Sequence, residues 1–119
     1  MTDNKILGNK GEALAKKYLL NHGYKIISCN YYYKHLEIDL IGEHQGNTIF
    51  IEVKTRIKTS NSLAENPLHK KQTKNLQKAI NNYCFNHHLD LEKISLDLII
   101  ILVDKKLNLA DLKHYKNIF

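Results

Sequence analysis

Apolar residues recur at helical spacing near the start of the chain and at alternating spacing further along it. In residues 7–22 they fall three or four positions apart and Gly23 follows as a stop signal, which predicts an amphipathic helix over 7–22. Residues 24–30 alternate and are rich in tyrosine and isoleucine, which predicts a strand, and the tyrosine-rich residues 30–35 predict a turn. The expected buried face of the helix consists of Leu7, Gly11, Leu14, Ala15, Tyr18 and Leu19.

Two further strands are predicted over residues 37–43 and 47–54. The polar, glycine-bearing residues 43–47 join them, so we expect an antiparallel hairpin. Residues 59–66 are small and polar and predict a loop, after which Pro67 begins a second helix. The expected buried stripe of that helix is Leu76, Ala79, Ile80, Tyr83 and Cys84.

The last third of the chain predicts two more strands. Residues 94–103 are nearly all apolar after Asp97, which favours a central strand, and residues 104–106 turn the chain into a final extended segment. The order helix, three strands, helix, two strands predicts an α/β sandwich with a mixed sheet of about five strands flanked by helices. With 119 residues, 43% of them hydrophobic, the chain is expected to form a single domain over 1–119.

The apolar runs are too short for a membrane span, the longest being residues 98–103. The polar N-terminus also lacks the pattern of a signal peptide, so we expect a soluble, cytoplasmic protein without a membrane partner. Cys29 and Cys84 lack metal-ligand spacing, and each lies in an apolar pattern that favours a small buried thiol.

The net charge of +6 is concentrated in one part of the sequence. Residues 54–78 hold seven bases against one acid, Glu65, which equals the whole excess. Such a basic stretch is typical of proteins that bind the phosphate backbone of a nucleic acid, although a lysine-rich helix face can also simply be solvated. The seven bases are Lys54, Arg56, Lys58, Lys70, Lys71, Lys74 and Lys78.

The predicted hairpin carries acids and a lysine in a pattern with chemical meaning. Glu52 and Lys54 share one face of their strand, and hairpin pairing brings Asp39 across from the Glu52 region. Carboxylates so placed among apolar residues repel each other unless a cation such as Mg²⁺ or Mn²⁺ lies between them. Lys54 would then orient water or neutralise charge on a phosphate. The alternative is a solvated strand face whose ion pairs contribute up to about 1 kcal/mol each.

Motifs along nearly the whole chain resemble the YraN-like family of small bacterial proteins. That family is similar to the PD-(D/E)XK nuclease superfamily and, within it, to Holliday-junction resolvases. The matching motifs are Gly8-x-x-Gly11-Glu12, Tyr18-Leu19, Gly23-Tyr24, Asn30, Glu37-Ile38-Asp39-Leu40-Ile41, Phe50-Ile51-Glu52-Val53-Lys54-x-Arg56, Lys71-Gln72, Ala79 with Tyr83, and His114-x-x-Asn117-x-Phe119.

The resemblance implies a restriction-endonuclease-like core that binds Mg²⁺ or Mn²⁺ and cleaves nucleic acid, DNA rather than RNA, in branched or single-stranded form. Asp39 and Glu52 would bind the metal, Lys54 would be the signature lysine, and Glu12 would complete the catalytic set. The similarity to resolvases also implies a homodimer, since a symmetric junction is cut twice. The residues expected to hold nucleic-acid phosphates are Arg56, Lys70, Lys71, Lys74 and Lys78.

The chain departs from the family pattern at three positions. Leu36 replaces a glycine, and Tyr32 and Ser95 replace arginines, which is expected to weaken phosphate or base contacts. An alternative function is therefore a catalytically inactive, nucleic-acid-binding accessory protein, and a third is a structural or protein-interaction domain. Asp97 is expected to have a structural role, paired with a lysine at a strand end.

The remaining polar and aromatic residues carry less information. The histidines, including His87, His88 and His114, form no recognisable zinc pattern. The tyrosines at 31–33 either stack on unpaired bases or pack against the fold.

Overall fold

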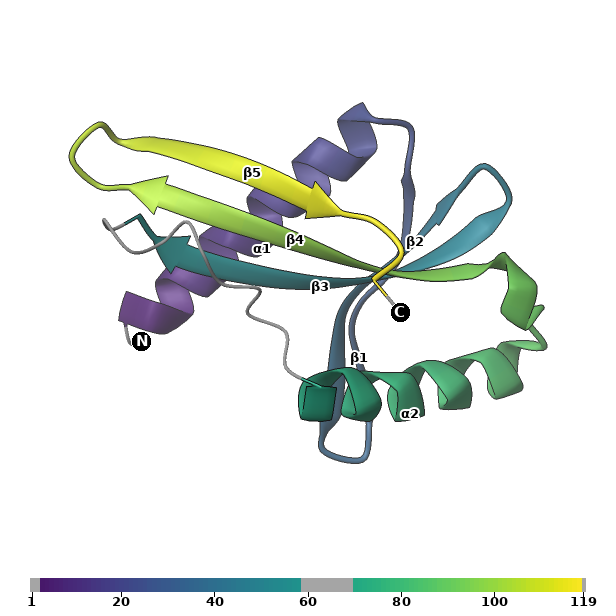
Figure 1. Ribbon diagram of the computed structural model, residues 1–119. Helices are drawn as coiled ribbons and strands as arrows, with labels where there is room; N and C mark the ends of the chain where they lie inside the picture. Colours follow the sequence, from purple (N-terminus) through teal and green to yellow (C-terminus); the bar gives the residue numbers. More distant parts are fainter. Residues whose placement is uncertain (1–2, 59–69, 119) are drawn as a thin grey trace.

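The helices and strands follow one another in the predicted order. The structure, a computed structural model, describes residues 3–58 and 70–118 (Figure 1). The order of one helix, three strands, one helix and two strands is confirmed, with one short 3-10 turn added at Leu91–Lys93. The elements are α1 (Asp3–Asn21), β1 (Lys25–Tyr33), β2 (Leu36–His44), β3 (Asn47–Ile57), α2 (Lys70–His87), β4 (Ile94–Asp104) and β5 (Leu109–Tyr115).

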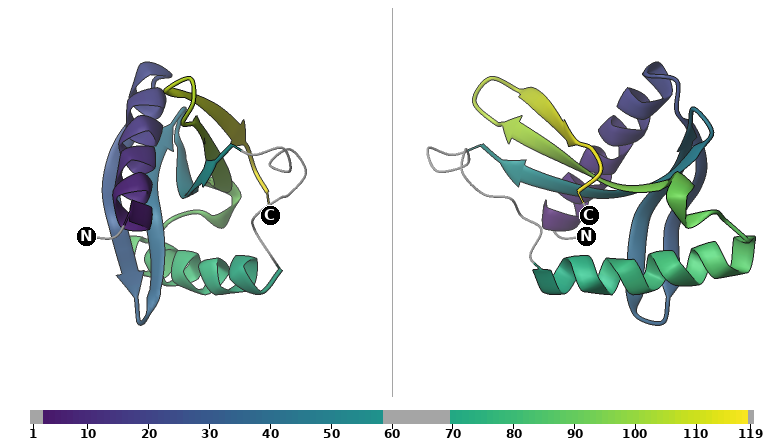
Figure 2. Two further views of the ribbon diagram at one scale, coloured as in Figure 1. Left: turned by 90° about the vertical axis from the view of Figure 1, so that its left-hand side faces the viewer. Right: turned by 45° about the vertical axis from the view of Figure 1, so that its right-hand side comes forward.

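The five strands form one open, mixed sheet in the order β1-β2-β3-β4-β5. Only β3 and β4 run parallel; the other neighbours are antiparallel. In Figures 1 and 2, α1 runs along the sheet and α2 crosses the β1–β2 hairpin near its turn. This arrangement confirms the predicted α/β sandwich and the internal position of β4.

Alternation along β3 produces two separate cores. On one face of β3, the alternate residues centred on Ile51 (49, 51 and 53) pack with Ala15 and Leu19 of α1. On the other face, Phe50 packs with Leu76 and Ile80 of α2. Because successive side chains of a strand point to opposite faces, each face of the sheet is covered by a different helix. The buried stripe predicted for α2 is confirmed in full.

Helix α1 begins four residues earlier than predicted and ends as predicted. Gly23, at φ 85°, follows its last turn, and the N–H of Tyr24 donates to the carbonyl of Leu19 at 2.9 Å. Leu14 was expected to be buried but is 42% exposed. The prediction was wrong because the contact stripe is narrow, consisting mainly of residues four apart: Gly11, Ala15 and Leu19.

Strand β1 is longer than predicted. The tyrosine-rich segment was expected to turn, but Tyr31, Tyr32 and Tyr33 pair with residues 38, 37 and 36 of β2, so the turn is confined to Lys34 and His35. Tyrosine favours strands, which explains the extension. The prediction that Cys29 is buried is also wrong, because it lies exposed on this edge strand, whereas Cys84 is buried as expected.

The β2–β3 hairpin turns at Gln45 and Gly46, whose φ angles of 51° and 81° are both positive. Two consecutive residues with positive φ are typical of a two-residue turn whose twist matches the flanking strands. The predicted loop over 59–66 and the helix start at Pro67 lie outside the described residues. Neither of the two described helices is long and apolar enough to cross a membrane.

Candidate active site

Strands β2 and β3 separate at the point where the predicted acids lie. Their pairing runs from His44 opposite Asn47 to Leu40 opposite Ile51. Beyond that pair β2 continues with β1, while β3 continues with β4 as far as Ile57. Figure 1 shows the β1–β2 hairpin bending away from β3. Beyond this last pair the next residue is Asp39 on β2 and Glu52 on β3. Both acids therefore lie where the two strands separate, a place that we call the fork.

Asp39 is fixed by the separation of the strands. Its Oδ2 accepts the N–H of Val53 at 2.8 Å. Where the strands diverge, this amide would lose a partner on β2, and the carboxylate takes that place. Asp39 also forms a hydrogen bond with Glu52, which is 6% exposed. The predicted encounter of these two acids across the hairpin is therefore present in the structure.

Glu12 reaches the same place from α1 because Gly11 allows a close approach. A Cβ atom added at Gly11 would overlap the Oγ1 of Thr55 on β3. Only glycine lets the helix backbone pack this closely against the strand. The adjacent Glu12 is thereby held beside the fork, half-buried, where the resemblance placed it.

Glu37 is a fourth acid at the site. Its carboxylate, with those of Glu12 and Asp39, supplies oxygens that all lie within 4.8 Å of one another. Ligands at about 2.1 Å from Mg²⁺ are at most about 4.2 Å apart, so small side-chain rotations bring these oxygens to ligand distance. Glu37 belongs to the matching motif at residues 37–41, but only Asp39 and Glu52 were predicted from the sequence as metal ligands, and Glu37 was given no role. The signal that would have found it is its position two residues before Asp39 on the same strand.

Glu37 is held in place from β1. The side-chain amide of Asn30 donates to Oε1 of Glu37 at 2.7 Å. Asn30 has φ 54° in the middle of a strand, a conformation rare for residues other than glycine. Tyr32, 62% exposed, also hydrogen-bonds Glu37, and this bond raises the pKa of the Tyr32 hydroxyl. Two side chains of β1 therefore orient this acid.

Burial and the neighbouring carboxyl groups raise the pKa of two of the acids, Asp39 and Glu12. Burial, the hydrogen bond and charge of Glu52, and the charge of Glu37 raise the pKa of Asp39 to about 9, against the opposing effect of the Val53 amide. Burial and the charges of Asp39 and Glu37 raise the pKa of Glu12, while Lys16 acts to lower it. A site that holds protons so strongly is one where a bound cation would relieve repulsion.

Lys54 and Arg56 line one cavity together with three of these acids, Glu12, Asp39 and Glu52. The cavity measures about 540 Å³. Lys54 is half-buried, whereas Arg56 is exposed and donates from Nη1 to the carbonyl of Thr55 at 3.0 Å. Glu52 and Lys54 therefore face the same space, as alternation along the strand predicted. The lining residues are Leu7, Gly8, Glu12, Asp39, Glu52, Val53, Lys54, Thr55, Arg56 and Ile57.

The other predicted phosphate-binding residues do not join this cavity in the described part of the chain. Lys74 and Lys78 are exposed on α2, and no described residue of that helix lines the cavity. Lys70 and Lys71 belong to the first turn of α2, but their side chains lie outside the described residues.

Asp97 belongs to a separate polar cluster. It is 2% exposed, its Oδ2 pairs with His114 Nε2 at 2.7 Å, and it accepts hydrogen bonds from Ser95 Oγ at 2.6 Å and the Asn117 N–H at 2.9 Å. The hydroxyl of Tyr18 lies 2.8 Å from Nδ1 of the same histidine. The structural role expected of Asp97 fits this network, but the expected lysine partner is wrong: the partner is His114, which strand pairing brings close.

The family model and the curated relatives point to the same family. The model of the uncharacterised protein family UPF0102 matches residues 11–101. A UPF0102 protein from Chlorobium phaeobacteroides is 36% identical over 99% of this chain and 96% of its own length. Another, from Syntrophomonas wolfei, is 38% identical over 85% of this chain and 88% of its own. An XisH family protein from Nostoc punctiforme has 12% identity and a TM-score of 0.39, covering 88% of this chain and 98% of that one.

Proposed function

The chain belongs to the uncharacterised protein family UPF0102, and we propose that it is a metal-dependent endonuclease that hydrolyses phosphodiester bonds in DNA. The observation that carries the proposal is the convergence of Asp39, Glu52 and Glu12 beside Lys54 in one cavity. The carboxylate of Glu37 lies next to those of Glu12 and Asp39. The proposed architecture is that of a restriction-endonuclease-like fold of the PD-(D/E)XK superfamily, with the active site at the strand fork.

The donor set fits a hard divalent cation. All four acids offer carboxylate oxygens, the ligands that Mg²⁺ and Mn²⁺ prefer, and no described cysteine or histidine lines the cavity. Asp39 and Glu52 would hold the metal, with Glu12 and Glu37 as further ligands from α1 and β2. When bound, such a cation polarises the phosphoryl group and lowers the pKa of a bound water.

The remaining steps are assigned to the chain's own residues. Lys54, on the same strand face as Glu52, would orient the attacking water and stabilise negative charge on the phosphate oxygens. Arg56 would bind an adjacent phosphate at the exposed rim of the cavity. The Val53 amide holds Asp39 in place throughout, because the contact belongs to the backbone.

The proposal is tested by incubating the protein with branched, flapped and single-stranded DNA in Mg²⁺ or Mn²⁺. We expect cleavage that is abolished by EDTA, by Asp39→Asn and by Lys54→Ala, while DNA binding by both variants persists. Lys105→Ala is the control and should cleave like the wild type, because Lys105 is exposed, does not line the cavity and is not among the expected phosphate-binding residues. Absence of cleavage by the wild type with every substrate and both metals would contradict the proposal.

A second candidate is a nucleic-acid-binding accessory protein without turnover. It is favoured by Tyr32, which occupies a position where an arginine is expected and contacts Glu37 rather than offering a positive charge. The same experiment separates the two functions, since tight DNA binding without cutting would support the accessory role. Absence of DNA binding at low salt would support an interaction domain instead.

A further inference from the structure

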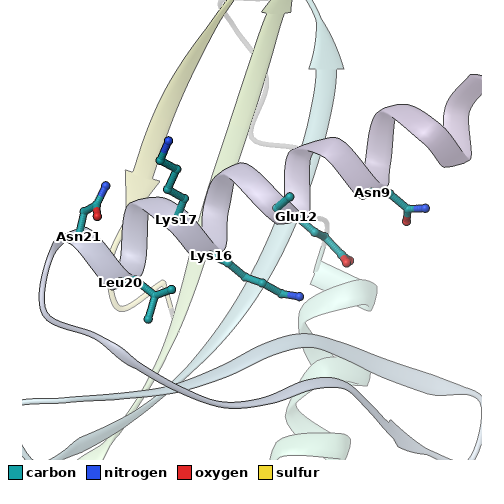
Figure 3. Close-up of a pocket in the computed structure, with 7 residues that line it drawn as sticks. Asn9, Glu12, Lys16, Lys17, Leu20 and Asn21 are labelled. Carbon is teal, nitrogen blue, oxygen red and sulfur yellow. The ribbon is translucent and has the colours of Figure 1, made fainter.

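A groove runs along α1 next to the acidic cavity. It measures about 490 Å³, and all of its lining residues come from this one helix. In Figure 3, Asn9, Glu12, Lys16 and Leu20 point to one side of the helix, whereas Lys17 and Asn21 point to the other. The full lining is Asn9, Glu12, Ala13, Lys16, Lys17, Leu20 and Asn21.

The groove is continuous with the proposed active site through Glu12, which lines both cavities. On the side of the helix that carries Glu12, the lining also contains Lys16 and no other acid, so its charge is positive where it leaves the acidic cluster. Leu20 is 58% exposed and Ala13 is exposed, which gives the groove an apolar surface beside Lys16. Positive charge beside apolar surface complements a chain of phosphates carrying bases.

We propose that this groove binds a single-stranded segment of nucleic acid that continues from the phosphate held at the acidic cavity. The inference rests on the proposed function, because it takes the acids as the place where a phosphate is held. One helical turn separates Glu12 from Lys16, and another separates Lys16 from Leu20. At about 5.4 Å per turn, the three side chains are spread over about 11 Å along the helix axis.

The chemistry of the groove favours an unpaired strand over a duplex. Lys16 is placed to meet the phosphate that follows the one at the acids, as a point charge. Leu20 offers an exposed apolar surface that can contact the face of a base, and a duplex conceals those faces in its stack. A substrate with a single-stranded arm would therefore gain contacts that a blunt duplex does not.

The test measures binding of a labelled duplex carrying an oligothymidine extension and of the same duplex with blunt ends. Fluorescence anisotropy is recorded with Ca²⁺, a hard cation with oxygen ligands, in place of Mg²⁺. The test variant is Lys16→Gln with Leu20→Ala. The matched control is Lys10→Gln with Leu14→Ala, which removes the same charge and the same apolar group at the same four-residue spacing from exposed positions outside the groove.

We expect the wild type and the control to bind the extended duplex about tenfold more tightly than the blunt one, and the test variant to bind both within about twofold. The test variant should also lower the slope of log affinity against log salt by about 1 for the extended duplex. A third variant, Leu20→Phe, enlarges the apolar surface and should increase the preference for the extension. A gain of affinity cannot arise from loss of folding.

Equal affinity of the wild type for the extended and the blunt duplex would overturn the inference. It would also be overturned if the test variant kept the preference for the extended duplex, or if the control variant lost it to the same extent. These outcomes are distinct from failure of the proposed function, which is judged by metal-dependent cleavage. The test variant could lose the preference for the extended duplex while the wild type shows no cleavage. That combination would support a groove that binds single strands on a protein that is not a nuclease.

Discussion

The carboxylate of Asp39 accepts the N–H of Val53 at 2.8 Å at the residue where β2 and β3 separate. This one hydrogen bond therefore gives the Val53 N–H a partner where the strands separate, and it fixes the orientation of an acid at the proposed metal site. An asparagine at this position retains an oxygen that can accept the same bond but carries no charge. Asp39→Asn is accordingly the variant that removes the charge of the site with the least change in its structure.

The stability of the metal-free protein should fall as pH rises because of Asp39. Its pKa of about 9 in the folded protein lies above its unfolded value of about 3.9, so the folded state retains a proton that the unfolded state has lost. The contribution of Asp39 to the free energy of unfolding is fully present below about pH 4 and is lost progressively as pH rises to about 9. Between these values the free energy of unfolding falls by up to about 1.4 kcal/mol per pH unit.

The measurement is urea unfolding of the wild type and Asp39→Asn in EDTA at several values between pH 5 and 9. We expect the difference in unfolding free energy between the two proteins to grow in favour of Asp39→Asn as pH rises. A difference that stays constant over this range would show that the carboxyl group titrates normally.

Two glycines on α1 make a matched pair for testing how Glu12 is held. Gly11→Ala places a methyl group against Thr55 and should destabilise the fold by about 1 to 2 kcal/mol, despite the better helix propensity of alanine. Gly8→Ala meets nothing within 4 Å and should stabilise by up to about 1 kcal/mol.

Thermal unfolding measures both effects, and titration with Mn²⁺ reports whether Glu12 has moved. We expect weaker Mn²⁺ binding in Gly11→Ala alone, because the helix must shift away from β3. Equal stabilities of the two variants would contradict the close helix–strand contact.

Asn30 combines a positive φ with a hydrogen bond to Glu37, and two substitutions separate these properties. Asn30→Gly tolerates the backbone conformation but loses the bond, whereas Asn30→Ala loses both. Asn30→Ala should be less stable than Asn30→Gly by about 1 kcal/mol, and both should bind Mn²⁺ less tightly than the wild type to a similar extent. Urea unfolding and calorimetry measure these two quantities. Unchanged Mn²⁺ affinity in both variants would remove Glu37 from the ligand set.

The network around Asp97 should affect stability and leave the metal site unchanged. Burial acts to raise the pKa of Asp97, but hydrogen bonds from His114, the Asn117 amide and Ser95 together outweigh it, and the net pKa is lowered. Stability from this group is therefore present above its unfolded pKa of about 3.9 and is lost as pH falls through the lower folded value.

Asp97→Asn should cost about 3 kcal/mol of unfolding free energy at neutral pH, because it breaks a buried hydrogen-bonded pair with His114. Chemical denaturation measures the loss, and Mn²⁺ titration of the folded variant provides the control. A large change in Mn²⁺ affinity would place Asp97 in the active site after all.

Short-range patterns were sufficient to predict the element order and half of the site. The polar, glycine-bearing residues 43–47 define the β2–β3 hairpin, and its register brings Asp39 and Glu52 together just beyond the last pair, Leu40 opposite Ile51. The same alternation placed Lys54 beside Glu52. These relationships span a few residues within one supersecondary unit, so sequence spacing carries them directly.

Relationships between distant elements could not be derived in this way. The hydrogen bond that holds Glu37 comes from Asn30, whose positive φ no hydrophobic pattern encodes. His114 reaches Asp97 through the pairing of β4 with β5. Lys16 was not among the predicted site residues, and only the packing of α1 beside the fork puts it one turn from Glu12 at the acidic cavity.

Calorimetric titration of Mn²⁺ into the wild type and Asp39→Asn tests the central claim most directly. We expect the wild type to bind Mn²⁺ with release of protons, seen as a binding heat that depends on the ionisation enthalpy of the buffer, and more tightly as pH rises toward 9. Asp39→Asn should show no binding in the same concentration range. Equal binding by the two proteins, or none by the wild type, would contradict a metal site at the fork of β2 and β3.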